Sequence, residues 1–400
     1  MKLLAINSGS STLKFRLYEM PNSDVLMKGT FEAIGDKNSF YSIRIGKDKT
    51  EKVVKIATHM DAAKILLDEL LSHGVIQNLE EIEAVGHRVV HGGNKYSKSV
   101  VVTPRVLKEV DKIKDFAPLH NPAALLGIEV FSKSIPKALE VVCFDTAFHQ
   151  TIEEKNYLYP VPYEWYIKHD IRKYGFHGLS HKFITLRMKD ILKKDFVHLI
   201  ICHIGNGASV SAIKNNQCID TSMGFTPNSG IMMGTRSGTI DYSILGYVMQ
   251  VTGMSYGDVD TILNKNSGLL GVTGMSDLRD IDRAYIAGEQ KVRLGVEMYA
   301  RRIADYIASY FLLLDGCVDA ICFTAGGGEN DDIIRGAVLD KIKALGVLID
   351  DSKNKEVIVR RGVEGVITDE NSSIPVYVVA TDEELMIAKD TYDLFLTCNK

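Results

Sequence analysis

The 400-residue sequence has little of what would direct a protein to nucleic acid or to a membrane. It has no block of five or more basic residues, and its formal net charge is −4, so nothing attracts a nucleic-acid backbone or an anionic membrane over a long range. No apolar run approaches the length of a membrane span, and the N-terminus has no basic segment followed by a long apolar one. We therefore predict a cytoplasmic globular protein without nucleic-acid or membrane partners.

Cysteine is scarce and is never paired in a C-x-x-C motif. This absence argues against a cysteine zinc site and against a disulfide framework. Three of the six cysteines lie inside apolar strand patterns, and we expect them to be buried free thiols: Cys143, Cys202 and Cys322.

The histidine motif of zinc proteases is absent too. His177 and His181 have helical spacing, as do His87 and His91, but neither pair has the glutamate of H-E-x-x-H or a third ligand nearby. We interpret all four as anion-binding or structural histidines.

Two common nucleotide-binding motifs are missing as well. No stretch matches G-x-x-x-x-G-K-[ST], and none matches G-x-G-x-x-G between a strand and a helix, which excludes the P-loop and Rossmann solutions. Three apolar strands end instead in small-residue turns, at residues 7–12, 205–209 and 326–330. Glycine lets backbone N–H groups approach a phosphate closely, and hydroxyl side chains add donors. Together the three turns predict a nucleotide held from several sides.

The order of the patterns along the chain predicts two domains. The chain is longer than a single core usually allows, and 46% hydrophobic residues suffice to fill two. Strand patterns at 3–7, 13–19, 25–34 and 40–46 precede a helical pattern at 61–73, for which Asp61 is the expected N-cap. The strand–turn–strand pattern recurs at 197–222, so we expect the same hairpin motif in each half. The first domain boundary is expected near Ala147.

The second half contains a long amphipathic pattern at 292–314, whose apolar face must pack on a sheet or on another subunit. A strand at 376–380 and a helix at 382–396 follow, and we expect this last helix to return to the first domain. The Tyr- and Pro-containing stretch 157–163 is interpreted as a surface connection or a crossing between the halves.

Polar residues interrupt apolar or glycine-rich segments at the expected strand ends, where open α/β sheets place ligands. Each of them alone is more often a structural group than a functional one. Beside three phosphate-type turns, however, such residues suit the charge that develops during phosphoryl transfer. They are Arg88, His91, His120, Asp145, His177 and Arg236.

Oxygen ligands for Mg²⁺ are offered by Asn7 and by the acidic residues 382–384. The alternative is that the acidic residues simply begin a helix, and for two of the three this is the better interpretation.

Eight ordered segments make the sequence resemble the acetate and propionate kinase family, within the sugar-kinase, Hsp70 and actin superfamily. The match extends from Leu3 to at least Ala388. It implies an α/β, two-domain actin-like ATPase (ribonuclease H-like) fold with a duplicated mixed-sheet core. It also implies an N-terminal domain of residues 1–147 plus 382–400, a nucleotide-binding and dimerising domain of residues 148–381, and a homodimer. The segments are 7–15, 86–93, 117–122, 144–149, 174–178, 203–209, 234–238 and 323–326.

The resemblance further implies an enzyme that transfers the γ-phosphate of ATP reversibly to acetate, giving acetyl phosphate and ADP, with Mg²⁺ or Mn²⁺ as the metal. By resemblance, the metal is held by Asn7 and Glu383, and the catalytic residues are Asp145, His177 and Arg236. The acetate site comprises Arg88 for the carboxylate, with Val90, Leu119, His120, Phe176 and Pro227. The ATP site comprises Ser10, Ser11, Thr12, Lys14, His203, Ile204, Gly205, Asn206, Gly207, Asp277, Leu278, Arg279, Gly326, Gly327, Gly328, Glu329 and Asn330.

The chemistry agrees with this assignment, because acetate is ionised at neutral pH and attacks the γ-phosphate without losing a proton. A strong general base is unnecessary, so we expect Asp145 to orient Arg88 or tune local charge. Arg236, His177 and the metal would neutralise the transferring group. Closure of the domains around ATP would exclude water.

The sequence departs from the family pattern at Asn228, Ser229, Thr239, Tyr242 and Gly327. The first four adjoin Pro227 and Arg236, which leaves propionate or another short-chain acid as an alternative acceptor. An ATP-driven switch like actin or Hsp70 is the alternative of a different class, since fold alone does not fix function. The arginines and histidines near the turns argue against that switch.

Overall fold

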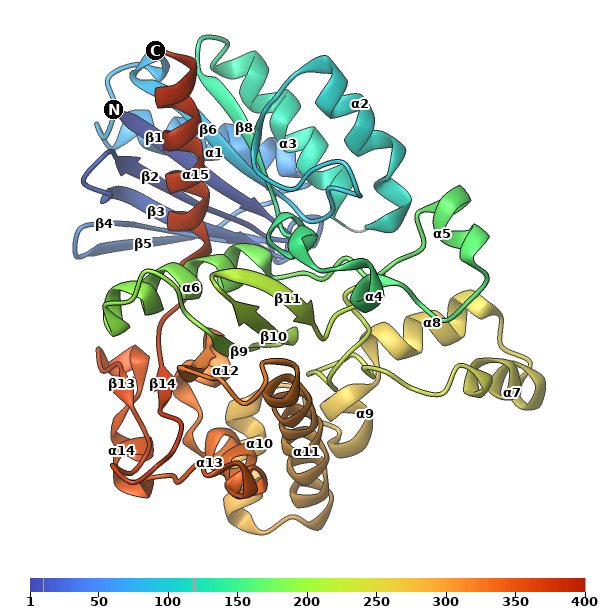
Figure 1. Cartoon of the computed structure of the whole chain (residues 1–400). Helices are drawn as coiled ribbons and strands as arrows, with labels where there is room; N and C mark the ends of the chain where they lie inside the picture. Colours follow the sequence, from blue (N-terminus) through green and yellow to red (C-terminus); the bar gives the residue numbers. More distant parts are fainter. Residues whose placement is uncertain (10, 118–119, 400) are drawn as a thin grey trace. The chain divides into compact units, whose positions relative to one another are not determined.

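The computed structural model describes residues 1–9, 11–117 and 120–399, which form two compact units (Figure 1). Unit 1 consists of Met1–Gln150 together with the C-terminal segment from Asp382, and unit 2 consists of Thr151–Thr381. The predicted positions Ser10 and Leu119 lie outside the described residues.

Unit 1 is built on a sheet with the strand order β5-β4-β3-β2-β1-β6-β8-β7. From β1 to β5 the strands form an antiparallel meander, whereas β6 and β8 continue from β1 in parallel. The strands are β1 (Lys2–Ser8), β2 (Leu13–Glu19), β3 (Asp24–Glu32), β4 (Phe40–Ile45), β5 (Asp48–Val53), β6 (Ile82–Val89), β7 (Val100–Val101) and β8 (Leu139–Phe144).

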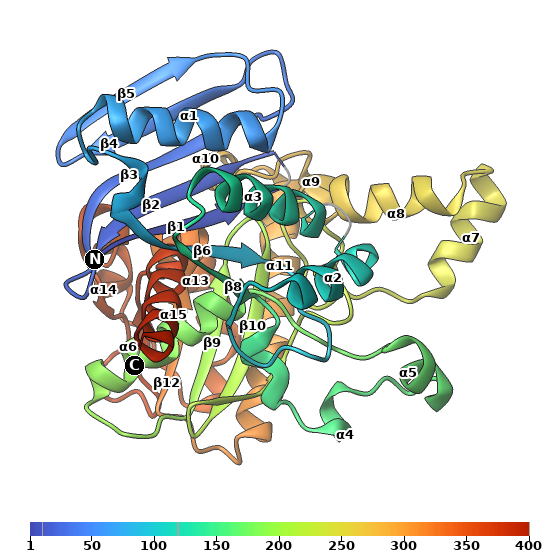
Figure 2. The same ribbon diagram turned by 90° about the horizontal axis from the view of Figure 1, so that it is seen from above.

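The two faces of this sheet are covered by different helices. On one face, α1 (His59–Ser72) and α3 (Asn121–Ser134) bury Leu66 and Phe131 against strand residues such as Phe15. The opposite face receives α15 (Glu383–Cys398), which contacts β1, β6 and β8 and lies across the sheet from α1 (Figure 2). A Cβ on Gly86 of β6 would lie 2.2 Å from Thr391 Oγ1, so the close approach of α15 requires glycine there. The remaining helix, α2 (Pro104–Lys112), packs against α3.

Unit 2 contains a second sheet with the order β11-β10-β9-β12-β14-β13. Its strands are β9 (Leu199–Ile204), β10 (Ala208–Lys214), β11 (Gln217–Thr221), β12 (Ala320–Thr324), β13 (Gly365–Val366) and β14 (Val376–Val378). Its helices are α4 (Glu154–Tyr157), α5 (Tyr163–His169), α6 (Gly178–Leu192), α7 (Ser243–Thr252), α8 (Tyr256–Lys265), α9 (Gly268–Thr273), α10 (Leu278–Ala287), α11 (Gln290–Leu313), α12 (Ala325–Asn330), α13 (Asp332–Lys341) and α14 (Asp351–Glu356).

Both sheets contain the same five-stranded core. An antiparallel hairpin and a third strand, β1-β2-β3 or β9-β10-β11, are followed by two strands parallel to the first, β6-β8 or β12-β14. The order third-second-first-fourth-fifth therefore occurs twice, which confirms the predicted duplicated mixed-sheet core and the repeated hairpin.

The long helix α11 confirms the amphipathic pattern and resolves where its apolar face packs. Val292, Val296, Ile303 and Ile307 are fully buried, and α11 contacts α9, α10, α13, β9 and β10. The face is therefore buried within unit 2.

Two local predictions are wrong. The N-cap of α1 is Thr58, and Asp61 is the third helical residue of a capping box in which each side chain accepts from the other's backbone N–H. The segment 326–330 is not a turn, because α12 begins directly after β12 and includes its glycines.

The cysteine prediction is confirmed: Cys143, Cys202 and Cys322 are buried free thiols. None of the helices in the described part of the chain has the length and apolarity that a membrane crossing requires.

Candidate active site

Arg88, at the end of β6, is held in a fixed orientation within unit 1. Its Nε donates to Asp145 Oδ1 at 3.1 Å and its Nη2 to Asp145 Oδ2 at 2.5 Å, which is a bidentate pair. Its Nη1 donates to Asn7 Oδ1 at 2.9 Å. Asp145 is only 1% exposed, and it follows β8, the parallel neighbour of β6. The strand ends thus bring together three residues that are far apart in the sequence.

The beginning of α15 adds carboxylates to this cluster. Asn7 Nδ2 lies 3.4 Å from Glu383 Oε2 and 3.3 Å from Glu384 Oε1. Arg16 of β2 binds Asp382 Oδ2 at 2.5 Å and Glu384 Oε2 at 3.3 Å. Two of the three acidic residues are therefore neutralised by an arginine, while Glu383 faces Asn7.

The charges of the cluster shift one another's ionisation. Burial alone would lower the pKa of Arg88, but Asp145 and Glu383 raise it above its ordinary value. Burial raises the pKa of Glu383 to about 7, with Arg88 opposing the rise and Asp145 adding to it. Glu383 is thus the member of the cluster that lacks a full counter-charge, as expected of a carboxylate that could take a cation.

Two histidines contact one serine in unit 2, and a third histidine stacks on one of them. Ser209 Oγ of β10 lies 2.9 Å from His177 Nδ1 and 2.8 Å from His181 Nε2. The rings of His177 and His203 stack with centroids 4.1 Å apart. His177 is the N-cap of α6 with a φ of 59°, a left-handed conformation that is rare outside glycine and is retained where the surroundings enforce it.

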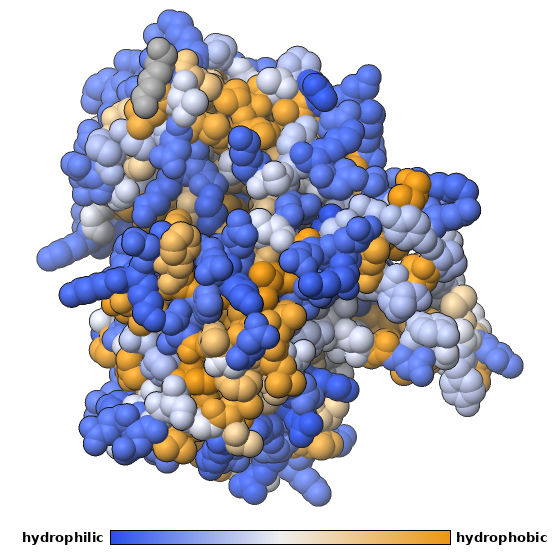
Figure 3. Space-filling model, viewed as in Figure 1, coloured by the Kyte–Doolittle hydropathy of each residue, from blue (hydrophilic) through white to orange (hydrophobic). Residues whose placement is uncertain are grey.

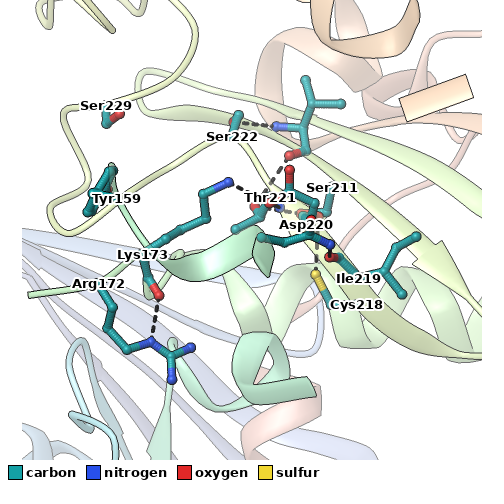
Figure 4. A network of polar contacts seen from close by, with 12 residues as sticks. Tyr159, Arg172, Lys173, Ser211, Cys218, Ile219, Asp220, Thr221, Ser222 and Ser229 are labelled. Atoms are coloured by element: carbon teal, nitrogen blue, oxygen red, sulfur yellow. Dashed lines mark hydrogen bonds and ion pairs between the residues drawn. The ribbon is translucent and has the colours of Figure 1, made fainter. Parts of the chain in front are cut away.

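The segment before His177 is held by the polar network of Figure 4. Lys173 Nζ binds Asp220 Oδ1 at 2.5 Å, and the backbone N–H groups of the next two residues both donate to Gly224 O, at 3.1 and 3.2 Å. This network fixes the chain just ahead of the strained histidine.

Arg236 lies beside the same loop. Its Nη1 donates to Pro227 O at 3.1 Å, and burial lowers its pKa. A Cβ on Gly207 would lie 3.4 Å from both Arg236 Nη1 and His177 Nε2. The glycine of the β9–β10 turn therefore lies next to both the Arg236 guanidinium and the His177 ring, and no described carboxylate pairs with Arg236.

A cavity of about 790 Å³ in unit 2 gathers most of the predicted ATP-binding segments. It is large enough for a nucleotide. Asp277, its neighbour Arg279 and the glycines of two predicted phosphate segments line it. The predicted residues in the lining are Gly205, Asn206, Asp277, Leu278, Arg279, Gly326, Gly327 and Asn330.

Two other predicted members of this site face elsewhere. Glu329 accepts backbone N–H groups from Ala325 and Thr381, both at 2.9 Å, and Gly328 lies against Phe323 and Cys202. Neither lines the cavity. His203 and Ile204 belong to β9 directly before the turn.

The other predicted residues of the nucleotide and acetate sites are divided between the two units. Ser11 and Thr12 lie in the β1–β2 turn, and Lys14 is exposed on β2. Val90 is buried, and His120 precedes α3. In unit 2, Phe176 is buried and Pro227 is half-buried.

The departures from the family pattern interact with one another. Thr239 Oγ1 accepts the N–H of Gly230 at 2.9 Å and lies 3.3 Å from Ser229 Oγ, so two departing residues together close the loop that holds Pro227. A Cβ on Gly327 would lie 2.5 Å from Leu278 Cδ1; Leu278 occupies the space that a larger residue would need.

Sequence reasoning missed four charged residues of the cavity lining: Asp282, Arg283, Asp331 and Arg360. Asp331 directly follows the predicted segment 326–330, so extending that segment by one residue would have included it. Arg360 makes no ion pair with a described residue, and its backbone N–H donates to Asn330 Oδ1 at 2.8 Å. No sequence signal links it to the other segments.

Asp282 and Asp331 form a carboxyl pair at the cavity wall. Asp282 Oδ1 and Asp331 Oδ2 are buried and receive no hydrogen bond from another described group, while each side chain is near the other. Burial first, and neighbouring carboxylates second, raise the pKa of Asp282 to about 6 and of Asp331 to about 7. Both shifts favour the protonated form of these carboxyl groups.

We expect Asp331→Asn to stabilise the protein at pH 8 and to have little effect at pH 5. Both pKa values are higher than the value near 4 of an unfolded aspartate, so the stability that protonation contributes is present in acid and is lost as the pH rises through about 6 to 7. Asparagine cannot ionise, and its side-chain oxygen still accepts the Ile334 N–H that caps α13. Thermal unfolding from pH 5 to pH 8 measures the difference. The exposed Asp340→Asn is the control, and a stabilisation by Asp331→Asn that does not grow with pH would contradict the raised pKa of Asp331.

Comparison with known proteins agrees with this architecture. A model of the acetokinase family matches residues 2–389. Acetate kinases of Geobacillus sp. (strain WCH70) and Bacillus subtilis (strain 168) are each 48% identical over 396 residues, which cover 98% of this chain and 98% and 99% of theirs. Among solved structures, a propionate kinase from Francisella tularensis has a TM-score of 0.93 at 39% identity, and Porphyromonas gingivalis acetate kinase 0.91 at 42%; each match covers 98% of this chain and 99% of the other.

The duplicated core is that of the actin-like ATPase (ribonuclease H-like) fold, and the protein is a kinase of that fold. The chain belongs to the acetokinase family.

Proposed function

We propose that the protein catalyses the reversible transfer of the γ-phosphate of ATP to acetate, giving acetyl phosphate and ADP. The observation that carries the proposal is the match over 98% of the chain to relatives that are acetate kinases. The cavity of unit 2 and the paired Arg88 of unit 1 supply sites of the right chemistry for the two substrates.

Arg88 binds the carboxylate of acetate in this mechanism. Asp145 holds the guanidinium through two hydrogen bonds and acts as a positioning residue, because acetate arrives ionised and has no proton to lose. An acetate oxygen forms a bond to the γ-phosphorus, the bond from that phosphorus to the bridging oxygen breaks, and ADP leaves with the electron pair. Val90, Phe176 and Pro227, together with Leu119, are proposed to contact the methyl group, and His120 to lie nearby.

Arg236 and His177 stabilise the charge that spreads over the transferring group. Both flank Gly207 of the phosphate turn, and Ser209 fixes the histidine ring. ATP is proposed to occupy the cavity, with Arg279 and Arg360 providing positive charge and the glycine segments providing backbone donors. Ser11, Thr12 and Lys14, with Ser10, are proposed to contact the phosphates.

Asn7 and Glu383 are proposed to hold Mg²⁺. The donor set fits this ion, since an amide and carboxylates supply hard oxygen ligands and Glu383 lacks a full counter-charge. No group of three or more His, Cys, Asp or Glu side chains suited to a metal occurs in the described ranges. This suits Mg²⁺, which takes few protein ligands and completes its shell with phosphate and water. When bound, the ion neutralises phosphate charge.

We also propose a homodimer, with α7 and α8 contributing to the interface. No residue of α7 is buried, and its large apolar side chains Ile244, Tyr247 and Val251 are 44%, 67% and 58% exposed. Figure 3 shows hydrophobic side chains among pale ones over these helices, at the right of the view. The sedimentation coefficient of the Val251→Asp variant tests this proposal. We expect the variant to sediment as a monomer, and an unchanged dimer would mean that the interface lies elsewhere.

Trapping of acyl phosphate with hydroxylamine tests the proposed reaction. With MgATP and acetate, propionate or butyrate, we expect product with acetate preferred. The similarity to a propionate kinase structure makes propionate the second candidate, and a preference for it would change the substrate but keep the mechanism. No product with any acid would contradict the proposal.

A further inference from the structure

Four cationic side chains form a continuous row across neighbouring strands of unit 1. Arg16 of β2 is directly opposite Lys28 of β3, Lys28 is opposite Arg44 of β4, and Arg44 is opposite Lys49 of β5. We call these four residues the basic row. Side chains alternate between faces along a strand, so all four lie on one face, the reverse of the face on which Phe15 and Ile43 are buried beneath α1.

Such an arrangement works against folding, because like charges directly opposite each other in a sheet repel. The ends of the basic row are compensated: Arg16 pairs with Asp382 and Glu384, and Lys49 pairs with Glu51 at 2.9 Å. In the middle, Lys28 and Arg44 form no ion pair with any residue that the structure describes. The chain as a whole has a formal net charge of −4, so this concentration of positive charge is local.

The basic row lines a cavity of about 390 Å³. The next set of paired residues on the same face of the sheet adds Lys14 and the hydroxyls of Thr30 and Ser42 to the lining. Glu384 is the one acidic residue among the described lining residues. The hollow is about half the volume of the cavity in unit 2, and it suits a small molecule. Figure 3 shows mainly hydrophilic side chains over these strands.

We propose that the basic row binds a small anion with two or three linked phosphoryl groups, in a hollow whose lining shares no residue with that of the nucleotide cavity. Of the lining residues of the hollow, only Lys14 is also proposed to contact ATP. Guanidinium groups and hydroxyls are the donors that recognise phosphoryl oxygens. Neighbouring strands lie about 4.8 Å apart, so the row extends over about 14 Å. A single phosphate would contact two adjacent cations, whereas a linked chain reaches the two unpaired cations in the middle and their neighbours.

Binding of tripolyphosphate, measured by calorimetry with EDTA present and without ATP, tests the proposal. The test variant is Lys28→Gln/Arg44→Gln, and the matched control is Lys37→Gln/Lys64→Gln, which removes the same charge at exposed positions outside the row. Hydrogen bonds to charged groups are stronger than those between neutral groups, so each lost cation is expected to weaken binding about tenfold, and the pair about 100-fold. The control should bind like the wild type.

Folding provides a second readout. Removing Lys28 and Arg44 relieves repulsion, so the test variant should melt no lower than the wild type. Tripolyphosphate should raise the melting temperature of the wild type and not that of the test variant.

Three outcomes would overturn the proposal. Equal binding by wild type and test variant would show that the row is not the site. Equal affinity for citrate and tripolyphosphate would show that charge alone is recognised. A higher KM for ATP in the test variant would assign the row to the nucleotide site. Only the KM measurement rests on the proposed function. If the protein did not catalyse the kinase reaction, the tripolyphosphate binding result could still be interpreted.

Discussion

Replacing Arg236 with alanine is expected to lower kcat for acetyl phosphate formation by about 10²–10³-fold. This is the range for removal of one preorganised group that stabilises transition-state charge in a site sheltered from water. Arg236 is held at Pro227 O, has no carboxylate partner among the described residues, and lies beside Gly207. Its charge is therefore available to a transferring phosphoryl group. Hydroxylamine trapping with saturating MgATP and acetate gives kcat directly.

Arg236→Lys is the matched control, because it keeps the charge and loses the planar fork. It should recover part of the lost rate. If Arg236→Ala raised only the KM for ATP and left kcat unchanged, Arg236 would bind the ground state of the nucleotide, and the proposed role would be wrong.

Replacing Arg88 with alanine is expected to destabilise unit 1 by about 3–5 kcal/mol as well as to abolish activity. Breaking a buried ion pair from one side leaves the other charge uncompensated, and Asp145 is only 1% exposed. Hydrogen exchange of peptides from β6 and β8 measures the effect where it arises and is independent of unit 2.

The double variant Arg88→Ala/Asp145→Ala separates the two consequences. Removing both charges should restore much of the stability while activity stays lost, since the acetate carboxylate still has no partner. Equal instability of the single and double variants would mean that lost packing, and not the unpaired carboxylate, causes the effect.

The fold was predictable because its repeated unit is short and local. The apolar strands on either side of residues 7–12 and 205–209 identify both hairpins, and both are present as β1-β2 and β9-β10. Long periodic helices such as α11 could also be predicted from the sequence. The N-cap residue of α1 could not be predicted, because Thr58 and Asp61 both favour helix starts and only their reciprocal hydrogen bonds distinguish them.

The site residues that were missed depend on tertiary structure. Arg360 and Asp282 reach the same cavity from distant segments, and nothing in their own surroundings marks them. The basic row is a more specific case: nothing in the sequence distinguishes Arg16, Lys28, Arg44 and Lys49 from other basic residues. Only the register of four strands aligns them. The predicted turn at 326–330 failed because glycines suit a tight strand-to-helix junction as well as a loop.

The membership of α15 in unit 1 has a consequence for biosynthesis. Unit 2 is continuous in the chain, whereas unit 1 is interrupted after Gln150 and is completed only by the last 19 residues. On the ribosome, the face of β1, β6 and β8 that α15 covers would wait for the synthesis of 250 further residues, which takes about 12–50 s at ordinary elongation rates. Unit 1 is thus the first part of the protein to be begun and the last to be completed, and during that interval the apolar surface that α15 covers stays exposed.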